Sequence, residues 1–258
     1  MSGNRLLLLL ILVVCCASVN AQEVEVEKIL LPIALRQPIP GAYGSLWKTE
    51  LWVRNDGQNP VEIVTDCQVG GCVPYLMPPG VAERELGIIY PRSDQPPGVF
   101  LLADPRYAGD LQISLRIRDL SRQELTWGTE LPVVRSTDLR VGKLGFLDVP
   151  LEARFRQMLR LYSMAAEPIP VTVSFFEIPW RTLAPQPALA TRALTIAPSA
   201  SGNFPGYVEL PDFASTIPEL IGKERVYVEI RSDSALPFWG FISVTNNETQ
   251  HVTTITPR

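Results

Sequence analysis

The sequence is poor in the residues that most often carry catalytic chemistry. It contains one histidine, His251, and four cysteines, two of which fall within residues 1–21. A serine-histidine triad would have to use His251, and no Gly-x-Ser-x-Gly motif is present to supply the nucleophile. A zinc site would need more ligands of these types than the chain offers. We therefore expect a protein that is not an enzyme and that holds no metal and no cofactor.

Acidic residues leave one catalytic alternative open. A glycosidase needs two carboxylates, and these can come from separate strands of a fold. The sequence places acids together on one strand face only at Glu23, Glu25 and Glu27, where alternation with valines is typical of a solvated face. There is no Asp-rich calcium loop and no Gly-rich phosphate loop.

An excess of positive charge is also missing. Lys and Arg number 23 against 27 Asp and Glu, so the formal net charge is −4. Nucleic-acid binding depends on neutralising phosphates, and this balance cannot supply a domain-wide basic face. By contrast, apolar residues make up 46% of the chain, which is ample for packed cores. The 24 prolines and 17 glycines favour many short strands over long helices.

No apolar run reaches the roughly 20 residues that a membrane-spanning helix needs. The run at residues 6–14 follows Arg5 and ends shortly before Ala21, a small residue suited to signal-peptidase cleavage. We expect a signal peptide over residues 1–21 and a secreted, periplasmic or cell-surface protein with no membrane span after cleavage. The alternatives are an uncleaved anchor and a lipoprotein modified at Cys15 or Cys16.

The two remaining cysteines, Cys67 and Cys72, are close together in the sequence. Gly70 and Gly71 between them allow positive φ and a tight reversal, so a hairpin loop closed by a disulfide fits an oxidising compartment. Such a bond would use both thiols, which disfavours a thiol nucleophile. We predict a Cys67–Cys72 disulfide with a local effect on stability, because the loop that it closes is short.

One sequence pattern occurs twice. Residues 47–64 and residues 155–172 each read as a half-buried strand, a polar turn and a second strand, and Pro60 in the first turn aligns with Pro168 in the second. The inward positions stay apolar or uncharged in both copies. The recurrence predicts two domains, over residues 22–135 and 136–258.

Strand signals continue through both halves. The clearest is at residues 111–118, where Leu, Ile, Leu and Ile alternate with polar side chains. A second internal match links residues 115–119, followed by Trp127-Gly128, to residues 228–233, followed by Trp239-Gly240. About seven short strands in each half are typical of a β-sandwich. We predict an all-β fold of two tandem immunoglobulin-like antiparallel sandwiches, with one short helix within residues 212–220. A single closed barrel would not explain the recurrence.

Two stretches carry a family resemblance. They are Gly41-Ala-Tyr-Gly-Ser-Leu-Trp47 with residues 49–55, and Trp239-Gly-Phe-Ile-Ser-Val-Thr-Asn-Asn-Glu-Thr-Gln-His-Val-Thr253. In these the chain resembles exported bacterial proteins of uncharacterised activity that are built from tandem immunoglobulin-like modules. The resemblance spans the mature chain and implies no activity. The layout is also similar to that of periplasmic pilus chaperones, although the segment characteristic of their donor strand has no match.

Trp52 differs from the other tryptophans because alternation places it on a charged strand face. An aromatic there is either covered by another element or part of a contact surface. The predicted binding surface consists of Trp52, Lys48, Arg54 and Trp180. The same alternation predicts that three other tryptophans lie in cores, namely Trp47, Trp127 and Trp239. A basic stripe is formed by Arg154, Arg156 and Arg160, and we interpret it as a solvated face.

These observations lead to a functional expectation. We expect a non-enzymatic structural or protein-binding module, whose partner is a protein or another cell-envelope component bound by an edge strand or by end loops. One alternative is a carbohydrate-binding module that uses exposed aromatics. Another is a periplasmic chaperone of surface-fibre subunits.

Overall fold

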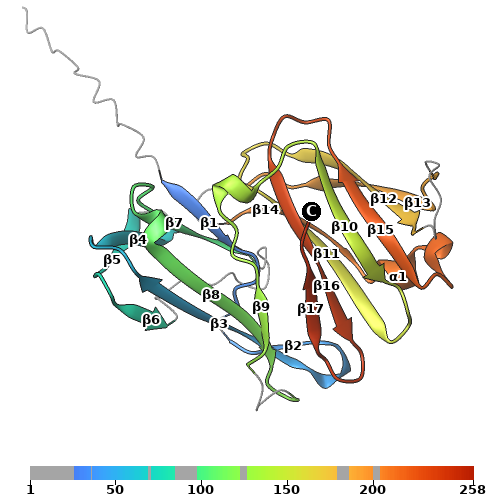
Figure 1. Ribbon diagram of the computed structural model, residues 1–258, viewed down its shortest axis with the longest axis horizontal. Helices are drawn as coiled ribbons and strands as arrows, with labels where there is room; N and C mark the ends of the chain where they lie inside the picture. The colour runs from blue at the N-terminus through green and yellow to red at the C-terminus, as the bar shows by residue number, and fades with distance from the viewer. Residues whose placement is uncertain are drawn as a thin grey trace, which may run out of the picture.

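The computed structural model describes residues 26–258, except for 36, 69–70, 85–97, 123–126, 179–185 and 200–203, and for residues 65–73 it describes the backbone only. Most of the described chain is β-structure, arranged in four antiparallel sheets (Figure 1). The predicted all-β class is confirmed. The predicted signal peptide lies outside the described residues.

The first half of the chain builds two sheets. Sheet A has the strand order β1-β7-β4-β5, and sheet B has the order β2-β3-β8-β9, with β6 also paired to β3. Two single-turn 3-10 helices, η1 (Ala42–Gly44) and η2 (Ala108–Asp110), lie between strands. The strands are β1 (Glu27–Leu31), β2 (Ile39–Pro40), β3 (Leu46–Asn55), β4 (Val61–Gln68), β5 (Gly71–Met77), β6 (Ala82–Arg84), β7 (Val99–Ala103), β8 (Leu111–Asp119) and β9 (Thr129–Leu131).

The second half builds the other two sheets. Sheet C has the order β14-β11-β16-β17, and sheet D has the order β10-β15-β12-β13. The strands are β10 (Lys143–Pro150), β11 (Phe155–Ser163), β12 (Ile169–Glu177), β13 (Ala190–Ile196), β14 (Gly206–Pro211), β15 (Arg225–Arg231), β16 (Phe238–Asn246) and β17 (Val252–Ile255).

Helices are few and short. The predicted short helix is present as α1 (Phe213–Thr216), followed by the 3-10 turn η4 (Pro218–Leu220). A further 3-10 turn, η3 (Ser136–Asp138), lies between the two halves. Within the described ranges, no helix has the length and apolar character needed to cross a membrane.

The two halves repeat one topology. Strand β3 in sheet B corresponds to β11 in sheet C, and β4 in sheet A corresponds to β12 in sheet D. The repeated sequence pattern at residues 47–64 and 155–172 is therefore a repeated strand pair. The remaining strands correspond as β1 with β10, β5 with β13, β6 with β14, β7 with β15, β8 with β16 and β9 with β17.

The second internal match made from the sequence is wrong by one strand. Residues 115–119 lie in β8, whose counterpart is β16, whereas residues 228–231 lie in β15, whose counterpart is β7. The match failed because β8 and β15 both alternate branched apolar with charged side chains, and alternation does not identify a strand's neighbours. The division into domains at residues 135 and 136 stays a prediction.

Alternation explains why β3 and β8 form strands and how they face. Thr49, Leu51 and Val53 are all at most 2% exposed, while Lys48 and Trp52 point to the other side of the sheet. The register of β3 with β8 places inward residues opposite inward residues. A slip of one residue would bury the charged side chains, so burial strongly determines this register.

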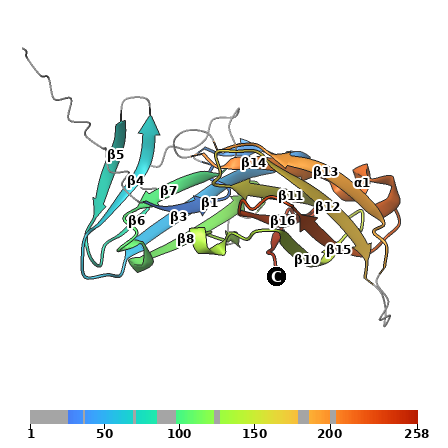
Figure 2. The same cartoon turned by 90° about the horizontal axis from the view of Figure 1, so that it is seen from above.

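Each half has its own apolar core, and the first core extends into the second half. Tyr162, Trp239 and Phe241 belong to β11 and β16, yet they pack in the cluster formed by first-half residues. The Tyr162 hydroxyl donates a 2.6 Å hydrogen bond to the Pro32 carbonyl oxygen. The Tyr162 and Phe241 rings stack with centroids 6.4 Å apart. The halves, which lie side by side in Figure 2, therefore share a packed apolar junction.

The predicted disulfide falls on the β4–β5 hairpin, where Cys67 stands opposite Cys72 in the strand register. Opposed residues of an antiparallel pair have Cβ atoms about 4.5–5.5 Å apart, and a disulfide needs about 3.5–4.5 Å. The two side chains lie outside the described part, so the disulfide itself stays a prediction.

Candidate functional site

The outward side chains of sheet B form a regular array across four strands. Trp52 on β3 stands opposite Ser114 on β8 and Arg84 on β6, and Arg116 on β8 stands opposite Glu130 on β9. Trp127, just before β9, packs on Arg116. We name this set the outer face of sheet B, and it comprises Lys48, Glu50, Trp52, Arg54, Arg84, Ser114, Arg116, Arg118, Trp127 and Glu130.

Three of the four residues predicted for the binding surface lie on this face. Lys48, Trp52 and Arg54 share it because they alternate with the buried residues of β3. Arg54 forms an ion pair with Asp56 at the end of the strand. The fourth residue, Trp180, lies outside the described residues. The sequence prediction identified the β3 part of the face and could not identify the neighbours that β6, β8 and β9 contribute.

Trp52 is exposed rather than covered by another element. Its side chain keeps 49% of its accessible surface, and the Arg84 guanidinium lies 5.9 Å from the centroid of its ring. A guanidinium over an indole is attracted by the ring's negative face and favours one ring orientation. Trp52 is therefore an oriented aromatic on the surface.

Trp127 was expected in a core, and the structure corrects this: its side chain is 81% exposed. The ordered pairing of β9 begins only at Thr129, so the alternation rule does not extend back to position 127. Gly128 has a positive φ of 71° and passes close to the backbone of β8, where a Cβ atom would come within 2.5 Å of the Ile117 carbonyl oxygen. This turn directs Trp127 outward, where Arg116 packs over its ring at 5.5 Å.

The outer face of sheet B holds more basic than acidic side chains, although the chain as a whole is net negative. It holds five basic residues, three on β8 and β6 and two on β3, against two glutamates. Glu50 accepts a 2.7 Å ion pair from Arg118 and lies 3.7 Å from Arg84, so it serves two guanidinium groups. Basic side chains therefore outnumber acidic ones within the face, and an anion near it would be attracted.

The predictions for the other tryptophans and for the basic stripe have different outcomes. Trp239 is 5% exposed in the core, as expected, and Trp47 is partly buried against the first core. The interpretation of the stripe as a solvated face is wrong for Arg156 and Arg160. These two extend from β11 toward the first half and line a cavity there. The sequence could not show this, because it does not reveal that sheet B covers that face.

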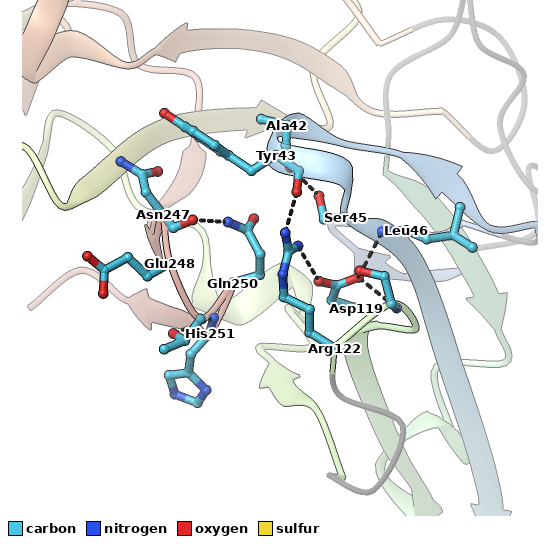
Figure 3. A network of polar contacts seen from close by, with 12 residues as sticks. Ala42, Tyr43, Ser45, Leu46, Asp119, Arg122, Asn247, Glu248, Gln250 and His251 are labelled. Atoms are coloured by element: carbon cyan, nitrogen blue, oxygen red, sulfur yellow. Dashed lines mark hydrogen bonds and ion pairs between the residues drawn. The ribbon is translucent and has the colours of Figure 1, made fainter.

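The histidine that a catalytic triad would need lies at the surface. His251 is exposed in the turn between β16 and β17, beside Gln250 (Figure 3). Within the same described ranges, no three His, Cys, Asp or Glu side chains come together in a way that could hold a metal ion.

Comparisons of the chain with protein-family models, with curated proteins and with solved structures found no match.

Proposed function

We propose that the protein is an exported, non-enzymatic binding module that binds an anionic glycan of the cell envelope on the outer face of sheet B. The observation that carries this proposal is the presence of two exposed tryptophans, Trp52 and Trp127, within one sheet face that is rich in arginine. Export is supported by the N-terminal sequence pattern.

The chemistry of the face suits a sugar chain that carries carboxylates or sulfates. Tryptophan offers a large, flat apolar surface at low conformational cost, and the C–H faces of pyranose rings stack on such surfaces. Arginine guanidinium groups bind carboxylate and sulfate oxygens through paired N–H donors. Ser114, between Trp52 and Arg116 in the array, adds a hydroxyl that donates and accepts hydrogen bonds.

The face is also held rigid before any ligand arrives. Its side chains extend from four hydrogen-bonded strands, and sites built on strands are more precisely placed than sites on loops. The Glu50 ion pairs and the two arginine–tryptophan contacts restrict the side chains further. Less rotamer entropy is therefore lost when a ligand binds.

The test is a binding panel of acidic polysaccharides, such as alginate and polygalacturonate, against neutral cellulose and dextran. We expect the acidic polymers to bind. Raised salt should weaken this binding, because salt screens exposed charges. Trp52→Ala and Trp127→Ala should each weaken binding about ten- to thirtyfold, as loss of one central tryptophan commonly does. The matched control is Leu147→Ala, which removes an exposed apolar side chain (57%) from β10 of sheet D.

Two results would count against this proposal. Equal affinity for acidic and neutral polymers would remove the role of charge. Binding that survives both tryptophan substitutions would move the site away from sheet B.

A second candidate is strand addition to a partner protein at β13, and one observation favours it. Within the described chain, β13 is a seven-residue edge strand with no proline and no register shift. The other edge strands of five residues or more differ: β1 is bridged by Val134, β5 contains Pro74, β14 ends in Pro211, and β10 has a bulge and accepts a hydrogen bond from Arg258. An uncovered edge strand is a ready template for pairing with another chain.

The two candidates are separated by isolating partners from the native envelope with matched variants. Ala193→Lys places a charge on the exposed side of β13, a substitution that blunts edge pairing. A partner lost with Ala193→Lys and kept with Trp52→Ala would support strand addition. The opposite pattern would favour the outer face of sheet B. In the described first half the edge strands are short, bridged or interrupted by proline, which gives the chaperone hypothesis little geometric support.

A further inference from the structure

A cavity of about 420 Å³ lies at the junction between sheet B and sheet C. Its volume falls within the range of small-molecule binding pockets, roughly 300–1,000 Å³. The wall supplied by the first half is almost entirely apolar. Its side chains come from the segment after β1, from β2, and from the inner ends of β3, β8 and β9, namely Ile33, Leu35, Ile39, Trp47, Ile117 and Leu131.

The opposite wall contributes the charge. Arg156, Met158 and Arg160 alternate along β11, so all three point from sheet C toward the first half, and Ser243 and Thr245 stand beside them on β16. Two guanidinium groups therefore border a cavity whose other wall is hydrocarbon. A partly buried cation without a matching anion is costly, and an anion is the group that would relieve this cost.

Arg156 is held in place by neutral groups. Its Nη1 donates to Asn247 Oδ1 at 3.0 Å, its Nη2 donates to Gln250 Oε1 at 2.6 Å, and its guanidinium lies 5.5 Å from the Tyr43 ring centroid. Figure 3 shows the two turns that supply these partners, η1 with Tyr43 and the β16–β17 turn with Asn247 and Gln250. Among the described residues, no carboxylate lies within ion-pair distance of Arg156. Burial lowers the pKa of Arg156 below its ordinary value.

Arg160 is partly neutralised. Its Nη1 donates to Ser243 Oγ at 3.1 Å, and its Nε lies 3.9 Å from a Glu209 carboxylate oxygen. The Nε atom is buried and has no hydrogen-bond partner within the described chain. Asp212 also borders the cavity, with one oxygen accepting a hydrogen bond from Ser215 Oγ at 2.7 Å. These two nearby acids would repel a multiply charged anion, so the charge balance favours a ligand with one negative charge.

We propose that this cavity binds a small amphiphilic carboxylate, with its carboxylate on Arg156 and its hydrocarbon chain against the apolar wall of the first half. The guanidinium keeps N–H donors beyond those used by Asn247 and Gln250, and these suit a carboxylate. The hydrocarbon would contact Leu35, Trp47 and Leu131 and gain burial. This site is separate from the outer face of sheet B, so the glycan proposal does not bear on it.

The test is calorimetric titration of the native chain with decanoate, decanol and decylamine, and with shorter and longer fatty acids. We expect decanoate to bind and the neutral and cationic analogues to bind at least about tenfold more weakly, because each lacks the charge-assisted hydrogen bonds. Arg156→Met should weaken decanoate binding about ten- to a hundredfold. Arg154→Met is the matched control, since the Arg154 side chain is 59% exposed and does not line the cavity.

A second variant keeps the test decisive if Arg156→Met fails to fold. Met158→Trp fills the cavity from the same strand without removing either arginine, and it should abolish decanoate binding. Decanol binding as tightly as decanoate, or native-like affinity in Arg156→Met, would overturn the proposal. Trp52→Ala should leave decanoate binding unchanged, whichever way the glycan experiment turns out.

Discussion

At the scale of single residues, the most demanding position is Asp119 at the end of β8. Its side chain is fully buried, and Oδ1 accepts hydrogen bonds from the Leu46 amide at 2.8 Å, the Ser121 amide at 3.0 Å and the Ser121 hydroxyl at 2.7 Å. Arg122 bridges Asp119 to the Tyr43 carbonyl (Figure 3). One carboxylate therefore holds together the start of β3, the turn after β8 and the η1 turn.

Asp119→Asn should lower the free energy of unfolding by about 2–3 kcal/mol at pH 7, because an amide replaces an ionised acceptor of several hydrogen bonds. Burial alone would raise the pKa of Asp119, but the hydrogen bonds from Leu46, Ser121 and Arg122 outweigh it and the pKa lies below its ordinary value of 3.8. The stabilisation is thus complete above the unfolded-state pKa and is lost as pH falls through the lower folded-state pKa.

Urea unfolding of Asp119→Asn and the native chain, at pH 7 and at steps below pH 4, measures both effects. The difference between the two proteins should shrink toward acid pH. Asp148→Asn is the control, since the exposed Asp148 carboxylate forms a 2.7 Å ion pair with Arg225 and its loss should change stability little. A difference that stays constant into acid would contradict the assigned role of the ionised carboxylate.

At the scale of elements, the packing of β16 against β11 depends on a glycine. Gly240 stands opposite Leu161 in the register, and a Cβ atom there would meet Leu161 Cδ2 at 2.5 Å and the Arg160 carbonyl oxygen at 2.7 Å. The second contact is with backbone, which cannot rotate away. The two strands can therefore approach at this point only without a side chain.

Gly240→Ala should destabilise the protein by about 1–3 kcal/mol, the usual cost of overpacking a filled interior. Gly109→Ala is the control, because nothing lies within 4 Å of a Cβ atom built there and its φ is not in the left-handed region. Thermal unfolding should show a lower Tm for Gly240→Ala and an unchanged or slightly raised Tm for Gly109→Ala. Equal Tm values for both variants would show that β16 adjusts more freely than its packing implies.

At the scale of the whole molecule, the junction couples the two halves. Tyr162 is fully buried, and its hydroxyl satisfies the Pro32 carbonyl, which belongs to the first half. Trp239 and Phe241 pack beside it within the first core. Because the same aromatic residues are part of sheet C and of the first core, each half loses apolar contacts when the other unfolds.

Tyr162→Phe should cost about 1–3 kcal/mol, since it leaves the buried Pro32 carbonyl without a donor. Phe241→Ala should cost about 3–5 kcal/mol, because it opens a cavity beside the same contacts. Denaturant unfolding of the native chain should follow one transition for both halves. In the junction variants this single transition should begin to separate into two. Tryptophan fluorescence and circular dichroism would then give different unfolding midpoints.

The sequence by itself determined the features that follow from local pattern. Alternation at Thr49, Leu51 and Val53 established which side of β3 is buried, and the aligned Pro60 and Pro168 revealed the repeated strand pair. These inferences hold because a strand has two faces and burial of one of them selects the register. The same alternation places Lys48, Trp52 and Arg54 on one outward face.

Only the tertiary structure decided what covers an outward face. Arg160 on β11 and Trp52 on β3 occupy equivalent outward positions of the repeat, yet the first half of the chain covers Arg160 and Trp52 stays exposed. Alternation predicts an inward Trp127 only when it is extended past the end of the short strand β9, and the structure places Trp127 outward. The partners of these residues lie many tens of positions away in sequence, and period-two patterning carries no information about contacts between separate sheets.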